Sequence, residues 1–69
     1  MIELIAIRIK EIRSEHHLSQ GKFGEILAVS QDTVSLWEKG KSLPSAEYVI
    51  KICKNFNVSA DYLLGLKEY

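Results

Sequence analysis

The apolar positions in most of this chain recur at helical spacing, in runs that begin shortly after a serine. Four runs begin in this way, after Ser19, Ser30, Ser45 and Ser59. A serine is a good N-cap because its hydroxyl accepts a hydrogen bond from an otherwise unpaired backbone N–H. Acidic side chains, which suit the positive end of the helix dipole, stand two residues after three of these serines, at Asp32, Glu47 and Asp61. The pattern predicts helices near residues 20–27, 31–39, 45–56 and 60–64.

The isoleucines of the first segment fit two patterns. They alternate over residues 5–9, as in a strand, and they recur every third or fourth position over residues 2–12, as in a helix. The sequence offers no second strand to pair with, and a lone strand leaves its backbone unsatisfied. We therefore predict a helix over residues 2–16. Leu4 and Ile7 then point away from the main apolar stripe, either as extra packing or as part of a partner surface.

Five short helices with brief connections predict a compact all-α fold, with residues 1–69 forming a single domain. A domain of this size buries only about 60% of the surface of its unfolded chain, so oligomerisation would help its stability. Lys and Arg number 9, and Asp and Glu number 9. This balance argues against indiscriminate binding of nucleic acid and leaves room for a specific binder with a local basic patch.

Other features of the sequence point to a cytoplasmic protein. The one cysteine, Cys53, lies in an apolar periodic run and is interpreted as a small core residue rather than a reactive thiol. The N-terminal run is interrupted by Glu3 and Arg8 and lacks the pattern of a signal peptide. No stretch approaches the roughly 18 apolar residues of a membrane span.

Only three residues, 28–30, separate the second and third predicted helices, which forces a large angle between them. This spacing predicts a helix-turn-helix over about residues 20–39, a motif whose second helix can enter the DNA major groove. At about 100° per residue, one arc of about 140° on that helix is polar apart from one leucine. It consists of Gln31, Asp32, Ser35, Leu36 and Lys39. Val34 and Trp37 fall on the opposite side and are expected in the core. Glutamine suits adenine, aspartate suits cytosine N4, serine suits base edges or phosphates, and leucine suits the thymine methyl.

The sequence resembles the Cro/cI-type (lambda-repressor-like, XRE) helix-turn-helix family over residues 5–65. The similarity is carried by "LSQ", by "VSQDTVSLWEKGKSLPS" and by "NVSADYLLG". It implies a five-helix lambda-repressor-like DNA-binding domain. It also implies a sequence-specific transcriptional regulator of double-stranded DNA, a repressor acting as a homodimer on a palindromic operator. The dimer contact is expected in residues 62–69.

The resemblance also assigns roles to individual residues. Gln20 would contact phosphate and brace the base-reading Gln31. Asp32 and Leu36 would face bases. Residues near the phosphate backbone would be Thr33, Lys39 and Lys41. Arg13 and Glu38 would form a partly buried ion pair that orients the helix over 31–39.

Lys22 lies at the start of the first motif helix, where a positive charge opposes the helix dipole. Two explanations stay open with equal weight: a nearby phosphate, or a solvated lysine with a small penalty.

The sequence departs from the family pattern at three points. Ala28 stands where the turn usually has glycine, and a positive φ there would cost alanine about 1 kcal/mol. Gly24 stands where alanine is usual; it allows a closer approach of the helices but costs about 0.8–1 kcal/mol of helix propensity. The base-facing positions hold few of the Arg and Lys side chains that read guanine. These departures bear on DNA affinity more than on the fold.

Other functional classes are less well supported. His16 and His17 point about 100° apart on a helix, so a shared metal is not expected, and no cofactor is implied. The sequence shows no nucleophile–base set and no glycine-rich phosphate loop, so an enzyme is not expected. The remaining alternative is a helix-turn-helix module that binds a protein, such as an antitoxin or regulatory partner. Leu36, Leu4 and Ile7 would then mark the partner surface.

Overall fold

The computed structural model describes residues 2–67 and is all-helical over that range. Its helices are α1 (Ile2–Glu15), α2 (Gln20–Leu27), α3 (Gln31–Glu38), α4 (Ala46–Phe56) and α5 (Ala60–Leu63). The five predicted helices are confirmed, each within one residue at either end. The helical interpretation of the isoleucine-rich first segment is also confirmed. None of the helices in the described range is both long enough and apolar enough to cross a bilayer.

Each of the four serines occupies an N-cap position, and three of them cap with the side chain. Ser19, Ser30 and Ser59 accept a hydrogen bond from the backbone N–H three residues ahead. Ser45 is the exception, because its hydroxyl accepts no capping hydrogen bond. Its carbonyl still accepts from the backbone N–H groups of Tyr48 and Val49, each at 3.0 Å. The prediction of four side-chain caps is therefore wrong at Ser45, where the helix starts with backbone bonding alone.

The core lies where the isoleucines of α1 meet the inner faces of the other helices. The buried cluster comprises Ile5, Ile9, Ile12, Phe23, Leu27, Val34, Trp37, Val49, Ile52, Phe56 and Leu63. Phe23 stacks on Phe56 with ring centroids 5.0 Å apart, which joins α2 to α4. The Trp37 ring lies 5.7 Å from that of Tyr48, which joins α3 to α4. The core position expected for Trp37 is confirmed, and Cys53 is half-buried against the same cluster.

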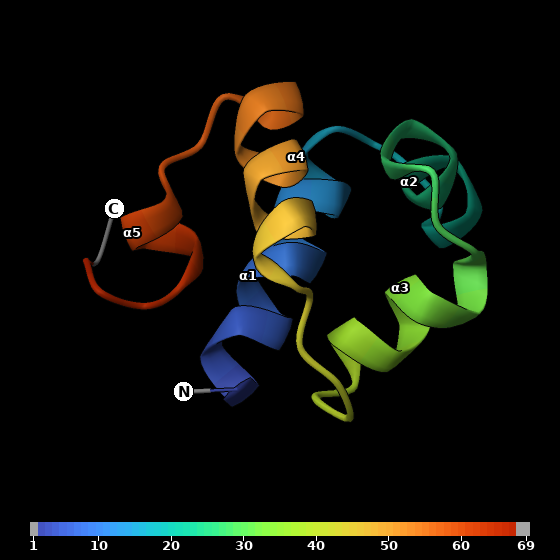
Figure 1. Cartoon of the computed structure of the whole chain (residues 1–69). Coiled ribbons are helices and arrows are strands. Elements are labelled where there is room, and N and C mark those ends of the chain that lie inside the picture. The colour runs from blue at the N-terminus through green and yellow to red at the C-terminus, as the bar shows by residue number, and fades with distance from the viewer. Residues whose placement is uncertain (1, 68–69) are drawn as a thin grey trace.

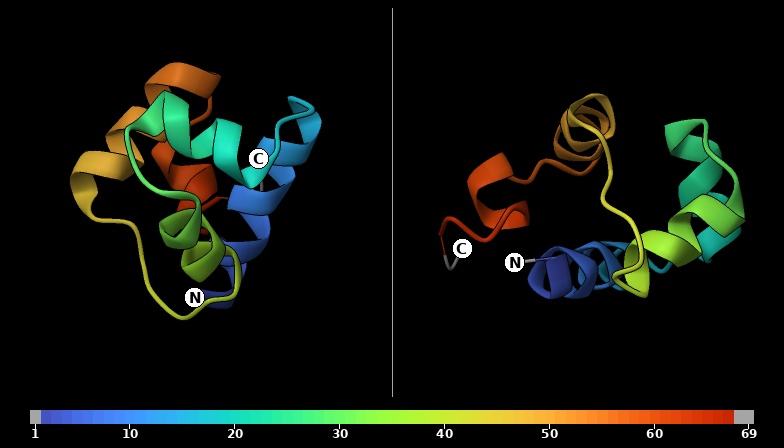
Figure 2. Two further views of the ribbon diagram at one scale, coloured as in Figure 1. Left: turned by 90° about the vertical axis from the view of Figure 1, so that its right-hand side faces the viewer. Right: turned by 60° about the horizontal axis from the view of Figure 1, so that its bottom comes forward.

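The helix-turn-helix and the C-terminal helix lie at opposite ends of the molecule. Figure 1 shows α2 and α3 on one side of the central α1 and α4, with α5 on the other side. The right-hand view in Figure 2 shows the same separation. The exposed surface of α3 is therefore far from the end of the chain, so the two ends can take part in different contacts.

The C-terminal segment folds back on α1 through Arg8 and Leu4. The Arg8 guanidinium donates to the carbonyl oxygen of Tyr62 and, at 2.9 Å, to that of Lys67. It also lies 4.4 Å from the centre of the Tyr62 ring. Leu4 packs so closely on Gly65 that a Cβ there would lie 2.7 Å from the leucine Cδ2. Leu4 is thus a packing residue, whereas Ile7 stays 55% exposed.

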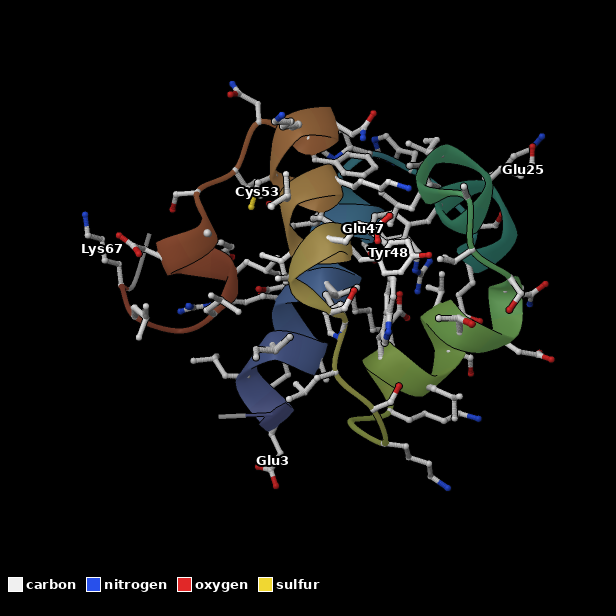
Figure 3. The ribbon with its side chains drawn as sticks, viewed as in Figure 1. Glu3, Glu25, Glu47, Tyr48, Cys53 and Lys67 are labelled. Carbon is white, nitrogen blue, oxygen red and sulfur yellow. The ribbon has the colours of Figure 1, made fainter. Side chains whose placement is uncertain are left out.

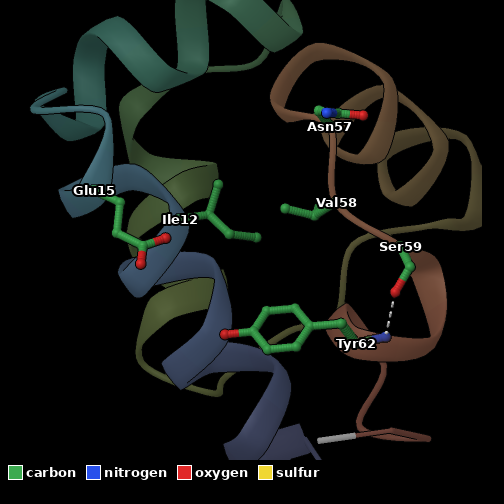
Figure 4. A pocket seen from close by; sticks show the side chains of 6 residues that line it. All are labelled: Ile12, Glu15, Asn57, Val58, Ser59 and Tyr62. Carbon is green, nitrogen blue, oxygen red and sulfur yellow. Dashed lines mark hydrogen bonds between the residues drawn. The ribbon is translucent and has the colours of Figure 1, made fainter. Parts of the chain in front are cut away.

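An open depression of about 350 Å³ lies between α1 and α5 (Figure 4). It is lined by Ile12, Glu15, Asn57, Val58, Ser59 and Tyr62. The hydrogen bond drawn there is the N-cap of α5, from the Tyr62 backbone N–H to Ser59 Oγ at 3.0 Å. None of the residues that line the depression belongs to α2 or α3.

Candidate DNA interface

Ala28 closes α2 in the left-handed conformation, with φ 62° and ψ 41°. Its N–H donates to Glu25 O at 3.3 Å, and the next N–H, of Val29, donates to Gly24 O at 2.9 Å. This pair of hydrogen bonds is the Schellman closure of a helix, which normally favours glycine at the left-handed position. Alanine was expected to lower stability by about 1 kcal/mol if this position had a positive φ. Ala28 does have a positive φ, so this loss of stability applies here.

Gly24 lies directly beneath the backbone that leads into α3. A Cβ at this position would lie 2.6 Å from the carbonyl oxygen of Val29. The close approach that the sequence suggested for this glycine is therefore present, and the chain that crosses it is the α2–α3 turn itself.

The turn places α3 with one face in the core and the other exposed. Val34 and Trp37 are buried. The exposed positions are Gln31, Asp32, Leu36 and Lys39, with Ser35 half-buried beside them. The expected division of the helix between core and surface is thus present. Leu36, at 43% exposure, projects among these polar side chains as the apolar group of the face.

Thr33 and Gln31 extend this face toward the start of α2. The Thr33 hydroxyl lies 3.0 Å from that of Ser30, so it is tied to the N-cap of α3. The side-chain oxygen of Gln31 lies 3.7 Å from the place a Cβ would take on Gly21. The first turns of α2 and α3 therefore share one surface, since Gly21 belongs to the first turn of α2.

A bidentate ion pair holds the C-terminal end of α3 against α1. Arg13 Nε lies 2.6 Å from Glu38 Oε2, and a terminal guanidinium nitrogen lies 2.9 Å from Glu38 Oε1. The other terminal nitrogen donates to the carbonyl of Leu18 at 2.9 Å. The hydrogen bond to Glu38 raises the pKa of Arg13, against the opposing effect of burial. The ion pair expected between these residues is formed, and its side chains are only 15% and 5% exposed.

Gln20 differs from its expected arrangement. Its amide nitrogen donates to Glu38 Oε1 at 3.2 Å rather than to Gln31. The buried carboxylate of Glu38 is a charged acceptor, which makes a stronger hydrogen bond than a neutral amide would. The expected brace between Gln20 and Gln31 is therefore replaced by a link from α2 to the end of α3.

The lysines around α3 differ in their pairing. Lys22 lies 3.7 Å from Glu25, with both side chains well exposed. This surface pair gives the lysine a partner in its own helix, without excluding a phosphate. Lys39 and Lys41 are exposed, and no ion pair within residues 2–67 includes either of them. Across residues 2–67, no cluster of three or more His, Cys, Asp or Glu side chains is arranged to hold a metal ion.

Two residues that the sequence pattern did not single out complete this end of the molecule. Leu43 is 54% exposed in the loop after α3, where the N–H groups of Lys41 and Ser42 bond back to Leu36 O. Lys51 Nζ lies 3.5 Å from Leu27 O and 5.1 Å from the centre of the Tyr48 ring. Figure 3 shows Tyr48 on the side of α4 that faces α2 and α3. Leu43 could have been noticed in the sequence as an apolar residue in a loop, directly before Pro44. No feature of the sequence pointed to Lys51.

The comparisons with known proteins agree with this geometry. The sequence model of the helix-turn-helix family matches residues 9–63. An uncharacterised HTH-type transcriptional regulator of Bacillus subtilis strain 168, YgzD, is 38% identical over 61 residues, which are 88% of this chain and 92% of that protein. The antitoxin PezA of Streptococcus pneumoniae is 37% identical over 62 residues, which are 90% of this chain but only 39% of PezA.

A solved structure is also similar. The P22 c2 repressor, crystallised with synthetic operator 9T in the presence of Tl⁺, superimposes with a TM-score of 0.81 at 30% identity, covering 87% of this chain and 91% of that one. The repressor protein C2 of Salmonella phage P22 is 31% identical in sequence over 90% of this chain, which spans 29% of that protein. With the helix-turn-helix found within residues 2–67, this chain therefore belongs to the Cro/cI-type (XRE) helix-turn-helix family of DNA-binding transcription regulators.

Proposed function

We propose that this protein is a sequence-specific repressor that binds double-stranded DNA as a homodimer on a palindromic operator. The proposal rests on the exposed face of α3, because its side chains are suited to bases and the helix itself is fixed by contacts with the rest of the domain. Val34 and Trp37 anchor its inner side, and the Arg13–Glu38 pair holds its far end. A helix that recognises bases must hold its side chains at defined positions in the major groove, and these contacts support such a role for α3.

The chemistry of the face suggests one role for each side chain. Gln31 suits a bidentate contact with adenine, and Asp32 suits cytosine N4. Leu36 suits a thymine methyl group. Ser35 suits a base edge or a phosphate. The backbone contacts fall to Thr33, Lys22, Lys39 and Lys41, whose hydroxyl and ammonium groups are phosphate donors.

Gln20 fits a phosphate role despite its bond to Glu38. A primary amide has two N–H donors, and the contact with Glu38 uses one of them. The second donor stays free for a phosphate oxygen at the start of α2. In this arrangement Glu38 positions Gln20, and Gln31 lacks the brace that the resemblance implied.

The dimer contact is proposed at the α5 end, where the chain folds back on α1. Leu66 is 63% exposed there, and Ile7 is 55% exposed on α1. This end lies away from α3, so two copies joined through it would leave both reading helices free (Figure 2). A two-fold dimer of this motif reads half-sites about 34–36 Å apart. Residues 68 and 69 of the segment expected to dimerise lie outside the described residues.

Sedimentation tests the dimer. The wild type should form a dimer in solution or on operator DNA, and Leu66→Glu should shift it toward monomer. Leu43→Glu, compared in solution without DNA because Leu43 lies near the candidate DNA interface, is a matched control that adds the same charge at another exposed leucine in a different loop. A wild type that stays monomeric at high concentration and on DNA would rule out this part of the proposal.

Selection from random DNA duplexes at two salt concentrations tests the function. We expect enrichment of a palindrome with half-sites about 10–10.5 base pairs apart, centre to centre. Log affinity should fall linearly with log salt, by about 0.9 for each phosphate contact. Selection that enriches no sequence at either salt concentration would contradict a sequence-specific regulator.

A second candidate, a helix-turn-helix module that binds a protein, is supported by two observations. PezA, a relative over most of this chain, is named as an antitoxin. Leu36 and Leu43 are exposed apolar groups near the end of α3, as on partner surfaces. The same salt series separates the candidates, because an apolar protein interface responds little to salt.

A further inference from the structure

Gly24 is buried within α2 although glycine is a poor helix former. A Cβ built on it would meet Val29 O at 2.6 Å and the Ser30 carbonyl carbon and oxygen at 3.4 Å. All three are backbone atoms, which cannot rotate aside as the end of a long side chain can. Since ordinary contacts begin at 3.4 Å, the Val29 carbonyl would have to retreat by about 0.8 Å to admit a methyl group.

The backbone that crosses Gly24 is the entrance to α3. Ser30 is the N-cap of that helix, and its hydroxyl accepts from Thr33 N at 3.2 Å. Its carbonyl accepts from Val34 N, also at 3.2 Å. The first helical residue, Gln31, follows directly. A displacement of the peptide between Val29 and Ser30 is therefore passed to the first turn of α3, where the proposed base contacts begin.

Ala28 restricts how the turn can respond. At φ 62° and ψ 41° it occupies the small left-handed region open to residues with a Cβ. Glycine explores a much wider range at positive φ. With alanine here, the turn has little freedom to rotate away from an added group at position 24.

From this geometry we infer that Gly24 is a positioning residue for the reading face of α3, acting together with Ala28. The missing Cβ lets the Val29–Ser30 peptide rest on α2 and so sets the angle between α2 and α3. Ala28 holds the turn at that angle. The inference rests on the proposed reading of DNA by α3 and adds that selectivity depends on a residue that touches no DNA.

The expected functional consequence is a loss of selectivity rather than of all binding. Base contacts by Gln31 and Asp32 depend on the position of short side chains at the helix start. Phosphate contacts by Lys39 and Lys41 come from long, flexible side chains that adapt to a small tilt. Gly24→Ala should therefore weaken binding to the selected operator and leave binding to random DNA nearly unchanged.

The test compares the wild type with Gly24→Ala, Ala28→Gly and the double variant. Competition with random duplex gives the ratio of operator to random affinity for each protein. Gly24→Ala should lower this ratio about tenfold, the effect of losing one base contact, with random-DNA affinity within about twofold. The double variant should recover at least half of the loss on a logarithmic scale, because glycine at position 28 lets the turn relax.

Gly21→Ala is the matched control for helix propensity. It makes the same substitution in the same helix, but its Cβ would meet only side-chain atoms, Gln31 Oε1 at 3.7 Å and Ser19 Oγ at 3.9 Å, so it is a control for the α2–α3 angle rather than for base selectivity. Its effect on the α2–α3 angle should be negligible. An unchanged ratio in Gly24→Ala, or a loss that the second substitution does not relieve, would overturn the inference. If Gly24→Ala alone does not fold, the double variant must fold, and its failure to do so would equally overturn it.

A measurement on the free protein tests the role of Gly24 independently of the proposed DNA binding. Residual dipolar couplings of backbone amides report the angle between α2 and α3 in each variant. Gly24→Ala should change the angle, the double variant should return toward the wild-type value, and Gly21→Ala should leave it unchanged. If the wild type selects no operator, the proposed function is contradicted. If the α2–α3 angle is unchanged in Gly24→Ala, the proposed role of Gly24 is contradicted.

Discussion

Arg13 and Glu38 face each other across α1 and α3 through two hydrogen bonds of 2.6 and 2.9 Å. The same carboxylate accepts from Gln20, and the same guanidinium donates to Leu18 O. One nearly buried carboxylate therefore links three helices at the C-terminal end of α3. Such pairs contribute more to defining one arrangement than to net stability, because burying both charges is costly.

Removing one partner of this ion pair should lower the free energy of unfolding more than replacing both partners by apolar residues. We expect Glu38→Ala to lower the free energy of unfolding by about 2–4 kcal/mol, because it leaves the Arg13 charge without its partner. Arg13→Met combined with Glu38→Leu should cost less than Glu38→Ala alone. Urea unfolding measures both. Glu25→Ala, which breaks an exposed pair with Lys22, is the control and should change stability by less than about 0.5 kcal/mol. A double variant at least as unstable as Glu38→Ala would show that the unpaired Arg13 charge is not the source of the loss.

Gln31 and Lys39 should differ in what their removal does to DNA binding. Gln31→Ala should cost about 1–3 kcal/mol on the selected operator and relax selectivity at one base pair. Lys39→Ala should weaken binding to all duplexes about equally and lower the salt slope by roughly one. Titrations of operator and random DNA over a salt series check both. Equal, sequence-independent losses from the two variants would contradict their assigned roles.

Leu36 should recognise a thymine methyl group. Replacing one thymine of the operator by deoxyuridine removes only that methyl, so wild-type binding should weaken by about 0.8 kcal/mol at the contacted position. Leu36→Ala should bind the two duplexes about equally. A scan of single thymine positions with both proteins makes this measurement. If no position responds to the methyl group, Leu36 is the first place to look for a protein partner instead.

The helix caps should differ in strength although the same residue type provides them. Ser59 caps α5 with its hydroxyl, whereas Ser45 makes no such bond at α4. Ser59→Ala should therefore lower stability by about 1 kcal/mol, and Ser45→Ala by only a few tenths. Thermal unfolding of the two variants gives the comparison directly, since each change removes one exposed hydroxyl. Equal losses would mean that the Ser45 hydroxyl caps α4 after all.

Tyr62 should titrate later than a free tyrosine. Burial, followed by the charge of Glu11 and the hydrogen bond to it, raises the pKa of the phenol above its ordinary value of 10.0, with Arg8 opposing. The folded state thus favours the neutral ring, so this contribution is present below pH 10.0 and is lost as pH rises toward the folded pKa. NMR titration of the ring should show a lower pKa in Glu11→Gln. An unchanged value would exclude Glu11 as a cause.

Local features of the sequence were enough to predict the helices and the motif. Helical spacing and serine N-caps act over three or four residues, so the five segments could be located from neighbours in the chain. The short connection over residues 28–30 implied the helix-turn-helix in the same way. The exposed face of α3 followed from the wheel, because Val34 and Trp37 occupy one side of a short helix.

Tertiary structure decided the contacts between segments that are distant in the sequence. Gln20 bonds Glu38 rather than Gln31, because α1 and α3 bring a buried carboxylate to the start of α2. Leu4 is covered by the turn at Gly65 while Ile7 stays exposed, a difference that periodicity could not give. The helical segments and the apolar side of each helix depend on near neighbours in the chain, so the sequence was enough to predict them. Which partner a side chain finds depends on distances of a few ångströms between helices, and these exist only after the chain has packed.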